Sequence, residues 1–127
     1  MANSRNKGKG GERELARLLR EEMGFDVTRN LNQTRDSGHD ILGLEPFALE
    51  VKREQTIRLP AWWRQAVSQA EAAGMKPALA YRLDRKGWRV RIPLDALIEG
   101  LGPVDDLEWT ADISLAAFCA VVREGNG

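Results

Sequence analysis

Two short apolar runs separated by a turn constrain the fold of this chain more than any other segment. They read HDILGL and FALEVKR, and Pro46 lies close to the turn between them. Runs of this length, joined by so few residues, predict a β-hairpin. Three charged residues, Asp40, Glu50 and Lys52, are set into these otherwise apolar strands. The sequence therefore raises the question of what keeps three charges inside a hairpin of a small protein.

The register of the hairpin decides which residues face each other. If the turn is centred on Glu45, residue 41 pairs with residue 49, and Asp40 lies directly opposite Glu50. Side chains alternate between the two faces of a strand. One face then carries the apolar side chains expected in the core, which are Ile41, Phe47, Leu49 and Val51. The other face carries Asp40, Glu50 and Lys52.

Two carboxylates on opposed residues need a cation between them. The Cβ atoms of directly opposed residues are roughly 4.5–5.5 Å apart, so the charges of Asp40 and Glu50 repel each other. Mg²⁺ prefers oxygen ligands and is held by one or two carboxylates together with water and phosphate oxygens. The hairpin therefore predicts a Mg²⁺ site, in which Mn²⁺ is expected to substitute.

A helix expected from about Gly10 to Met23 supplies a third carboxylate. Its apolar stripe consists of Leu15, Ala16, Leu19 and Met23. Glu12 falls in the middle of this stripe, whereas Glu14 and Glu21 point away from it. An acidic residue near a helix N-terminus is favoured by the helix dipole. Glu12 can therefore either aim at the hairpin carboxylates or simply help the helix to start.

The remaining elements complete an α/β fold. Pro60 opens a second helix, AWWRQAVSQAEAA, which Gly74 closes. The segments PALAYRL and WRVRIPL predict a strand pair, LDALIEG a short helical segment, and Asp112 a cap for a last helix, ISLAAFCAVVRE. The order αβββαββ predicts a mixed central sheet flanked by helices, with a C-terminal helical appendage. We expect residues 1–10 to form a flexible basic arm, 11–93 the core, and 94–127 an appendage of the same domain.

Asp40 and the triplet Glu50-Val51-Lys52, with Glu12 on an upstream helix, resemble the PD-(D/E)XK nuclease superfamily. The likeness is greatest to archaeal-type Holliday junction resolvases and to small phage nucleases related to them. It covers roughly residues 7–92 and includes, in the order of the family, KGKGGERELARLL, TRDSGHDIL, LEVKR and WWRQA. His39 precedes Asp40 where the superfamily has Pro, at a turn position and not at a ligand. The resemblance implies a restriction-endonuclease-like core.

The resemblance also implies roles for the candidate site residues. Asp40, Glu50 and the backbone carbonyl of Val51 would hold one or two Mg²⁺ ions, and Glu12 would complete the metal shell. Lys52 would orient the attacking water or offset charge that develops on the phosphate. Gln65 on the second helix could position Lys52 or the water, and periodicity does not choose between it and Gln69, one turn further on; both could equally be solvated. His39 is either a further ligand or a bystander.

Basic residues are concentrated before the C-terminal segment. Residues 1–93 hold 18 Lys and Arg against 12 Asp and Glu, a net charge of +6, and residues 94–127 hold one Arg against seven acidic residues, a net charge of −6. Such a surface can attract a polyanion, and it can also be a solvated surface with uneven charge. The expected DNA contacts are Lys7, Lys9, Arg13, Arg29, Arg35, Ser37 and Arg53, of which Arg35 and Ser37 follow from the resemblance. Trp62 and Trp63 are adjacent, so we expect one to cover the sheet and the other to meet DNA or a partner subunit.

These features predict a Mg²⁺-dependent, structure-selective DNA endonuclease, a Holliday junction resolvase that makes paired symmetric cuts by phosphodiester hydrolysis. Two symmetric cuts require two sites, which implies a homodimer acting on branched DNA, especially four-way junctions, in recombination and repair. The alternatives are a general, repair or restriction-type nuclease of the same superfamily, and a catalytically silent DNA-binding module. The single Cys119 and the absence of an apolar run of roughly 20 residues indicate a cytoplasmic, nucleoid-associated protein with no membrane partner. The compact chain and the likeness are compatible with a phage protein that acts in the host cell.

Overall fold

Six strands form one mixed sheet in the part of the chain that the computed structural model describes, which is residues 4–23, 28–29, 41–83 and 85–126. The spatial order of the strands equals their order in the sequence. They are β1 (Thr28–Arg29), β2 (Ile41–Leu42), β3 (Phe47–Arg53), β4 (Lys76–Arg82), β5 (Arg89–Pro93) and β6 (Thr110–Ser114). β3 and β4 are parallel, and the other neighbouring pairs are antiparallel. The α/β class and the mixed sheet expected from the sequence are confirmed.

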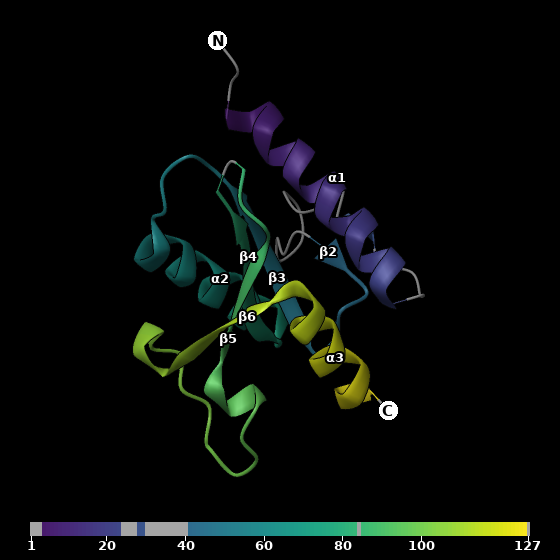
Figure 1. Cartoon of the computed structure of the whole chain (residues 1–127). Coiled ribbons are helices and arrows are strands. Elements are labelled where there is room, and N and C mark those ends of the chain that lie inside the picture. The colour runs from purple at the N-terminus through teal and green to yellow at the C-terminus, as the bar shows by residue number, and fades with distance from the viewer. Residues whose placement is uncertain (1–3, 24–27, 30–40, 84, 127) are drawn as a thin grey trace.

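Helices cover both faces of the sheet (Figure 1). α1 (Ser4–Met23) and α3 (Leu115–Asn126) pack on one face, where their apolar side chains join a core cluster with the strand residues Leu49, Val51 and Val90. α2 (Leu59–Ala73) packs on the other face, where Trp62, Trp63 and Ala66 contact Leu79. Two short 3₁₀ turns, η1 (Leu94–Ala96) and η2 (Leu107–Trp109), lie between β5 and β6. No helix among the described residues is both long and apolar enough to cross a bilayer.

The hairpin register is confirmed at the pair that the structure describes. Ile41 pairs with Leu49, and the amide of Phe47 donates a 2.9 Å hydrogen bond to the carbonyl of Leu44 across the turn. Ile41, Phe47, Leu49 and Val51 are buried together, as the alternation predicted. Asp40 lies outside the described residues. One further step in the same register would put residue 40 opposite Glu50, so that pairing stays a prediction.

α2 is the crossover that makes β3 and β4 parallel. It begins at Leu59, and Pro60 in its first turn has no amide hydrogen to lose. Its end is fixed by Gly74, whose φ of 67° is left-handed and therefore suits a residue without a Cβ. The sequence predicted both ends of this helix.

Three structural expectations need correction. α1 begins at Ser4, so the helix extends through most of the segment for which a flexible arm was expected. Asp112 does not cap the last helix but lies in β6, a strand that the sequence did not predict. The hydroxyl of Ser114 instead accepts a 3.1 Å hydrogen bond from the amide of Ala117, in the first turn of α3.

The two adjacent tryptophans are a third case, because both are buried. The ring of Trp62 lies 6.2 Å from that of Tyr81, at a tilt of 48°. The Nε1 of Trp63 donates a 2.7 Å hydrogen bond to the carbonyl of Asp105, in the segment that joins η1 to η2. The chain itself therefore covers the tryptophan that was expected to meet DNA or a partner.

Candidate active site

A buried carboxylate in the middle of β3 forms the centre of the candidate site. Glu50 is 4% exposed and is the one acidic or basic residue among those described that is buried as a whole. Its Oε1 accepts a 2.9 Å hydrogen bond from the Nε2 of Gln65. The Nζ of Lys52 lies 3.8 Å from the same oxygen. A carboxylate, an ammonium and an amide thus meet at one point between β3 and α2.

Local geometry explains this meeting. Glu50 and Lys52 are two residues apart on a strand, so their side chains leave the same face of the sheet. Leu49 and Val51 between and beside them point to the opposite face and enter the core cluster with α1. Gln65 follows the buried Trp62 by three residues on α2, which keeps it near the helix face that packs on the sheet.

The structure separates two candidates that the sequence left open. Gln65, and not Gln69, is the glutamine whose hydrogen bond to Glu50 is observed. Burying a carboxylate without partners costs several kcal/mol. The contacts from Gln65 and Lys52 offset part of this cost, and they hold the Glu50 side chain in one orientation.

A second polar network lies further across the sheet, separated from Glu50 by the apolar Leu79. In register, Glu50 pairs with Leu79, which pairs with Arg91, which pairs with Asp112. The carboxylate of Asp112 accepts a hydrogen bond from the hydroxyl of Tyr81, and its two oxygens lie 2.6 Å from Arg89 Nε and 3.5 Å from Arg91 Nη2. Burial, together with the hydrogen bond to Asp112, raises the pKa of Tyr81 above its ordinary value.

Sequence reasoning missed this network because it did not predict β6. The alternation in WRVRIPL already places Arg89 and Arg91 on one face of their strand. It does not identify the acid that faces them, because Asp112 is in contact only after β6 has paired with β5.

Glu12 lies on α1, among the buried side chains Leu15, Ala16 and Leu19, and stays partly exposed. α1 packs on the face of β3 that carries Leu49 and Val51, whereas Glu50 and Gln65 meet on the other face. The role of Glu12 in a metal shell stays a prediction.

Glu14, which the helix periodicity had turned away from the core, makes the main polar contact of α1 with the sheet. Its Oε1 accepts hydrogen bonds from Arg82 Nη1 and, at 2.9 Å, from Trp88 Nε1. Its Oε2 lies 3.6 Å from Arg53 Nη1. Gly11 permits this close approach, because a Cβ at that position would lie 3.1 Å from Arg53 Cβ. Arg53, expected to contact DNA, is thus engaged with α1 in this structure.

The other expected DNA contacts are only partly described. Arg13 is exposed on α1. Lys7 and Lys9 belong to α1 and Arg29 to β1, but their side chains are not described. Arg35, Ser37 and His39 lie outside the described residues, as Asp40 does.

The donor set suits a hard divalent cation as far as it is described. Among the described residues no three His, Cys, Asp or Glu side chains gather as a metal cluster. The buried carboxylate of Glu50 and the neighbouring backbone carbonyl of Val51 offer oxygen atoms, which are the ligands that Mg²⁺ prefers. Asp40 would add a third oxygen ligand from the expected register.

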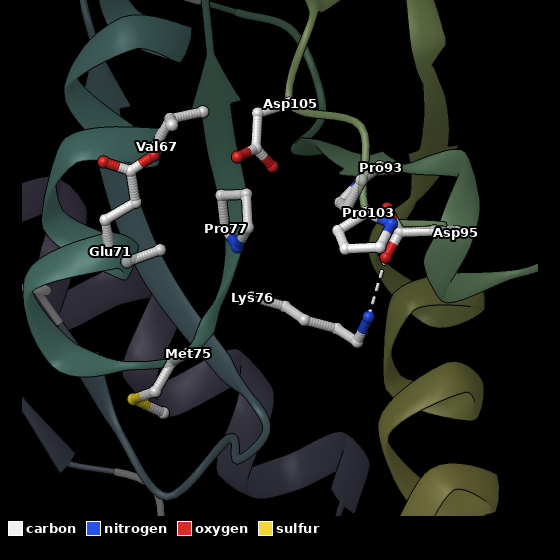
Figure 2. A pocket seen from close by; sticks show the side chains of 10 residues that line it. Val67, Glu71, Met75, Lys76, Pro77, Pro93, Asp95, Pro103 and Asp105 are labelled. Carbon is white, nitrogen blue, oxygen red and sulfur yellow. Dashed lines mark hydrogen bonds and ion pairs between the residues drawn. The ribbon is translucent and has the colours of Figure 1, made fainter. Parts of the chain in front are cut away.

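Figure 2 shows a pocket that lies away from this site. Its volume is about 130 Å³. It is lined by α2, the start of β4 and the segments that follow β5, and a 2.7 Å ion pair joins Lys76 Nζ to Asp95 Oδ2 at its wall. Lys76 pairs with Phe47 at the beginning of β3, whereas Tyr81 pairs with Lys52 near its end. The pocket therefore lies toward the opposite end of the sheet from Lys52.

Comparisons with known proteins agree with the fold. Residues 3–110 match a family described as "Phage putative PDDEXK endonuclease". Protein D14 of Escherichia phage T5 is 26% identical, over 78% of this chain and 77% of its own length. The solved structure of Hjc, a Holliday junction resolvase of the archaeal hyperthermophile Archaeoglobus fulgidus, matches with a TM-score of 0.57 and 24% identity, over 87% of this chain and 97% of Hjc. The fold is therefore that of Hjc, which confirms the restriction-endonuclease-like core.

Proposed function

The chain belongs to the phage PDDEXK endonuclease family, and we propose that it is a Mg²⁺-dependent, structure-selective DNA endonuclease that resolves Holliday junctions by paired symmetric cuts. The observation that carries the proposal is the convergence of Glu50, Lys52 and Gln65 between β3 and α2. The fold shared with Hjc, which is named as a Holliday junction resolvase, supports the choice of substrate.

The residues that would hold the metal are Asp40, Glu50 and the carbonyl of Val51. Glu12, whose helix packs on the opposite face of β3, would complete the shell through water. When bound, the Mg²⁺ ion would supply Lewis-acid stabilisation of the scissile phosphate, and Mn²⁺ is expected to replace it. The hydrogen bond from Gln65 holds the Glu50 carboxylate in the orientation that this role would need. Gln65 is therefore a positioning residue and not a catalytic one.

Lys52 is proposed to orient the attacking water and to offset charge on the phosphate. Its ammonium is held on the Glu50 side of β3, at 3.8 Å from Oε1. From there it would orient the attacking water and offset the negative charge that develops on the phosphate oxygens. Hydrolysis would leave a 5′-phosphate.

Branched DNA and a second copy of the chain are the proposed partners. Lys7, Lys9, Arg13, Arg29, Arg35, Ser37 and Arg53 are the proposed backbone contacts, and such contacts position a protein without reading sequence. Two opposed cuts in a four-way junction require two sites, so the proposed active form is a homodimer. We place this activity in the cytoplasm at the nucleoid, as a phage protein would act in its host.

A second candidate is an endonuclease of the same family without junction selectivity. The description of the matched family supports it, because that description names an endonuclease and no particular DNA structure. The site would be identical, and only the shape of the bound DNA would differ.

The test is a panel of end-labelled four-way, Y-shaped, flap and linear duplex DNA, each incubated with Mg²⁺ or with EDTA. Paired symmetric nicks in the four-way substrate, abolished by EDTA, are the expected result. Equal cutting of linear duplex would support the second candidate instead. Salt-sensitive binding without product under Mg²⁺ or Mn²⁺ would contradict both and leave a silent DNA-binding module.

A further inference from the structure

We propose that a cleft beside Lys52 binds one unpaired nucleobase of the DNA substrate. The inference rests on the proposed function, since it assumes that Lys52 lies next to the cut strand. The cleft has a volume of about 480 Å³, within the range of roughly 300–1,000 Å³ that is typical of small-molecule sites. Its lining residues are Ile57, Tyr81, Leu83, Lys86, Gly87, Trp88 and Arg89.

The position of the cleft follows from the strand register. Tyr81 on β4 is the direct partner of Lys52 on β3, and Arg89 on β5 is the partner of Tyr81. Neighbouring strands are roughly 4.8 Å apart. Ile57 lies in the segment that leaves β3 for α2. The cleft therefore opens one to two strands away from the Lys52 side of the candidate active site, at the same end of the sheet.

The chemistry of the lining suits a nucleotide. Ile57, Tyr81, Leu83 and Trp88 offer apolar or aromatic surface, and Lys86 and Arg89 are cationic. None of the lining residues is acidic. A flat base gains from apolar and aromatic contact, while the phosphate attached to it gains from nearby cations. Arg89 is partly neutralised by Asp112, so Lys86 supplies the main phosphate contact.

Two of the walls are held in place before any ligand arrives. The hydroxyl of Tyr81 donates a hydrogen bond to the carboxylate of Asp112, and the ring of Tyr81 lies against the ring of Trp62. Trp88 is fixed by the 2.9 Å hydrogen bond from its Nε1 to Glu14. Ile57, in contrast, is 45% exposed at the rim, where it gains burial only if something covers it. Rigid walls reduce the entropic cost of binding.

An unpaired base fits this cleft better than a base pair does. In a duplex the faces of each base are covered by its stacked neighbours, so a base must leave the stack before it can enter a concave site. Nucleotides next to a branch point or a flap are the ones that can do so at low cost. The cleft would thus select DNA in which pairing is interrupted beside the cut.

The test is a binding cycle in EDTA with the full-length protein and a four-way DNA. Each nucleotide next to the branch is replaced in turn by an abasic analogue. We expect wild type to lose affinity by about tenfold at one position. Ile57→Ser should bind the intact DNA about tenfold more weakly and show no further loss with the abasic analogue. Ile98→Ser, whose residue is 51% exposed in the segment after η1, is the matched control and should behave as wild type.

Lys86→Met checks the phosphate contact. It should weaken binding of intact and abasic DNA equally and reduce the salt dependence by about one counterion. Equal affinity of wild type for intact and abasic DNA at every position would overturn the inference, as would an unchanged abasic loss in Ile57→Ser or an unchanged salt dependence in Lys86→Met. Cleavage of the same four-way DNA with Mg²⁺ is scored separately. Cleavage without any effect of the abasic analogues would contradict only the base-binding cleft. Base-dependent binding without cleavage would contradict only the proposed nuclease activity.

Discussion

At the scale of single residues, the sequence identified the centre of the site but not all of its supports. Glu50 and Lys52 were assigned from their alternation in a strand, and the structure places them side by side beneath Gln65. Asp40 lies outside the described residues, so its half of the metal site stays a prediction. Glu14 was missed because helix periodicity reports only which face is apolar. It does not report that two arginines and a tryptophan from distant parts of the chain converge on a carboxylate.

The hydrogen bond from Gln65 leads to a prediction about orientation. Gln65→Ala should lower the rate of cleavage by roughly 10- to 100-fold, because partners that orient a metal-binding residue typically contribute that much. DNA binding should change little. Gln69→Ala is the matched control, one turn further along α2, and should keep the wild-type rate. Single-turnover cleavage measures the effect, and equal rates for the two variants would contradict the role of Gln65.

The buried thiol of Cys119 leads to a prediction about alkaline stability. Burial, with a smaller contribution from Glu22, raises the pKa of the Cys119 thiol from its ordinary value of 9.0 to about 11. Below pH 9 the thiol is protonated in both states. Between pH 9 and pH 11 it ionises more readily in the unfolded chain, so stability falls as pH rises.

Urea unfolding at pH 8 and at pH 10.5 measures this fall. Cys119→Ala should reduce the difference in unfolding free energy between the two pH values, although Tyr81, whose pKa is also raised, keeps part of it. An identical pH dependence in wild type and in Cys119→Ala would show that the thiol does not ionise in this way.

At the scale of elements, α1 is attached to the sheet by an apolar stripe and by one acidic side chain. The stripe was predictable, because Leu15, Ala16 and Leu19 recur with helical spacing. The contact through Glu14 joins α1 to β3, β4 and the residue before β5, and no local pattern indicates it. β6 was missed for a similar reason, since TADIS is short and half polar and becomes a strand by pairing with β5. Elements whose stability depends on distant partners are the ones that sequence patterns predict least well.

Glu14 and Glu21 provide a matched pair on this helix. Glu14→Ala should lower the free energy of unfolding by about 2–3 kcal/mol, because it removes the carboxylate that Arg53, Arg82 and Trp88 share. Glu21 is exposed and pairs only with Arg17 at 3.7 Å among the described ion pairs, so Glu21→Ala should change stability by less than about 0.5 kcal/mol. Thermal or urea unfolding distinguishes the two. Equal effects would mean that Glu14 is not a structural anchor.

At the scale of the whole molecule, the C-terminal segment is part of the sheet and the core. It carries the acidic excess of the chain, and the sequence predicted a helical appendage of the same domain here. The structure instead adds β6 to the sheet and packs α3 beside α1 (Figure 1). The net charge of this segment can be read from its composition. The burial of Phe118, Cys119 and Val122 in the core cannot, because it depends on how α3 packs on the sheet.

Two aromatic residues of this segment test its contribution. Phe118 is fully buried, with its ring 5.3 Å from that of Phe47, and Phe118→Ala should destabilise the protein by about 3–5 kcal/mol. Trp109 is 46% exposed, so Trp109→Ala should cost less than about 1 kcal/mol. Urea unfolding measures both. A small effect of Phe118→Ala would mean that α3 contributes little to folding.

The comparison of wild type with Glu50→Gln, in cleavage and binding of four-way DNA, tests the central claim most directly. The substitution keeps the shape of the side chain and removes its charge. With Mg²⁺ we predict cleavage to fall by roughly 10³-fold or more, while binding in EDTA stays within about threefold of wild type. A Glu50→Gln protein that cuts at the wild-type rate would contradict the account.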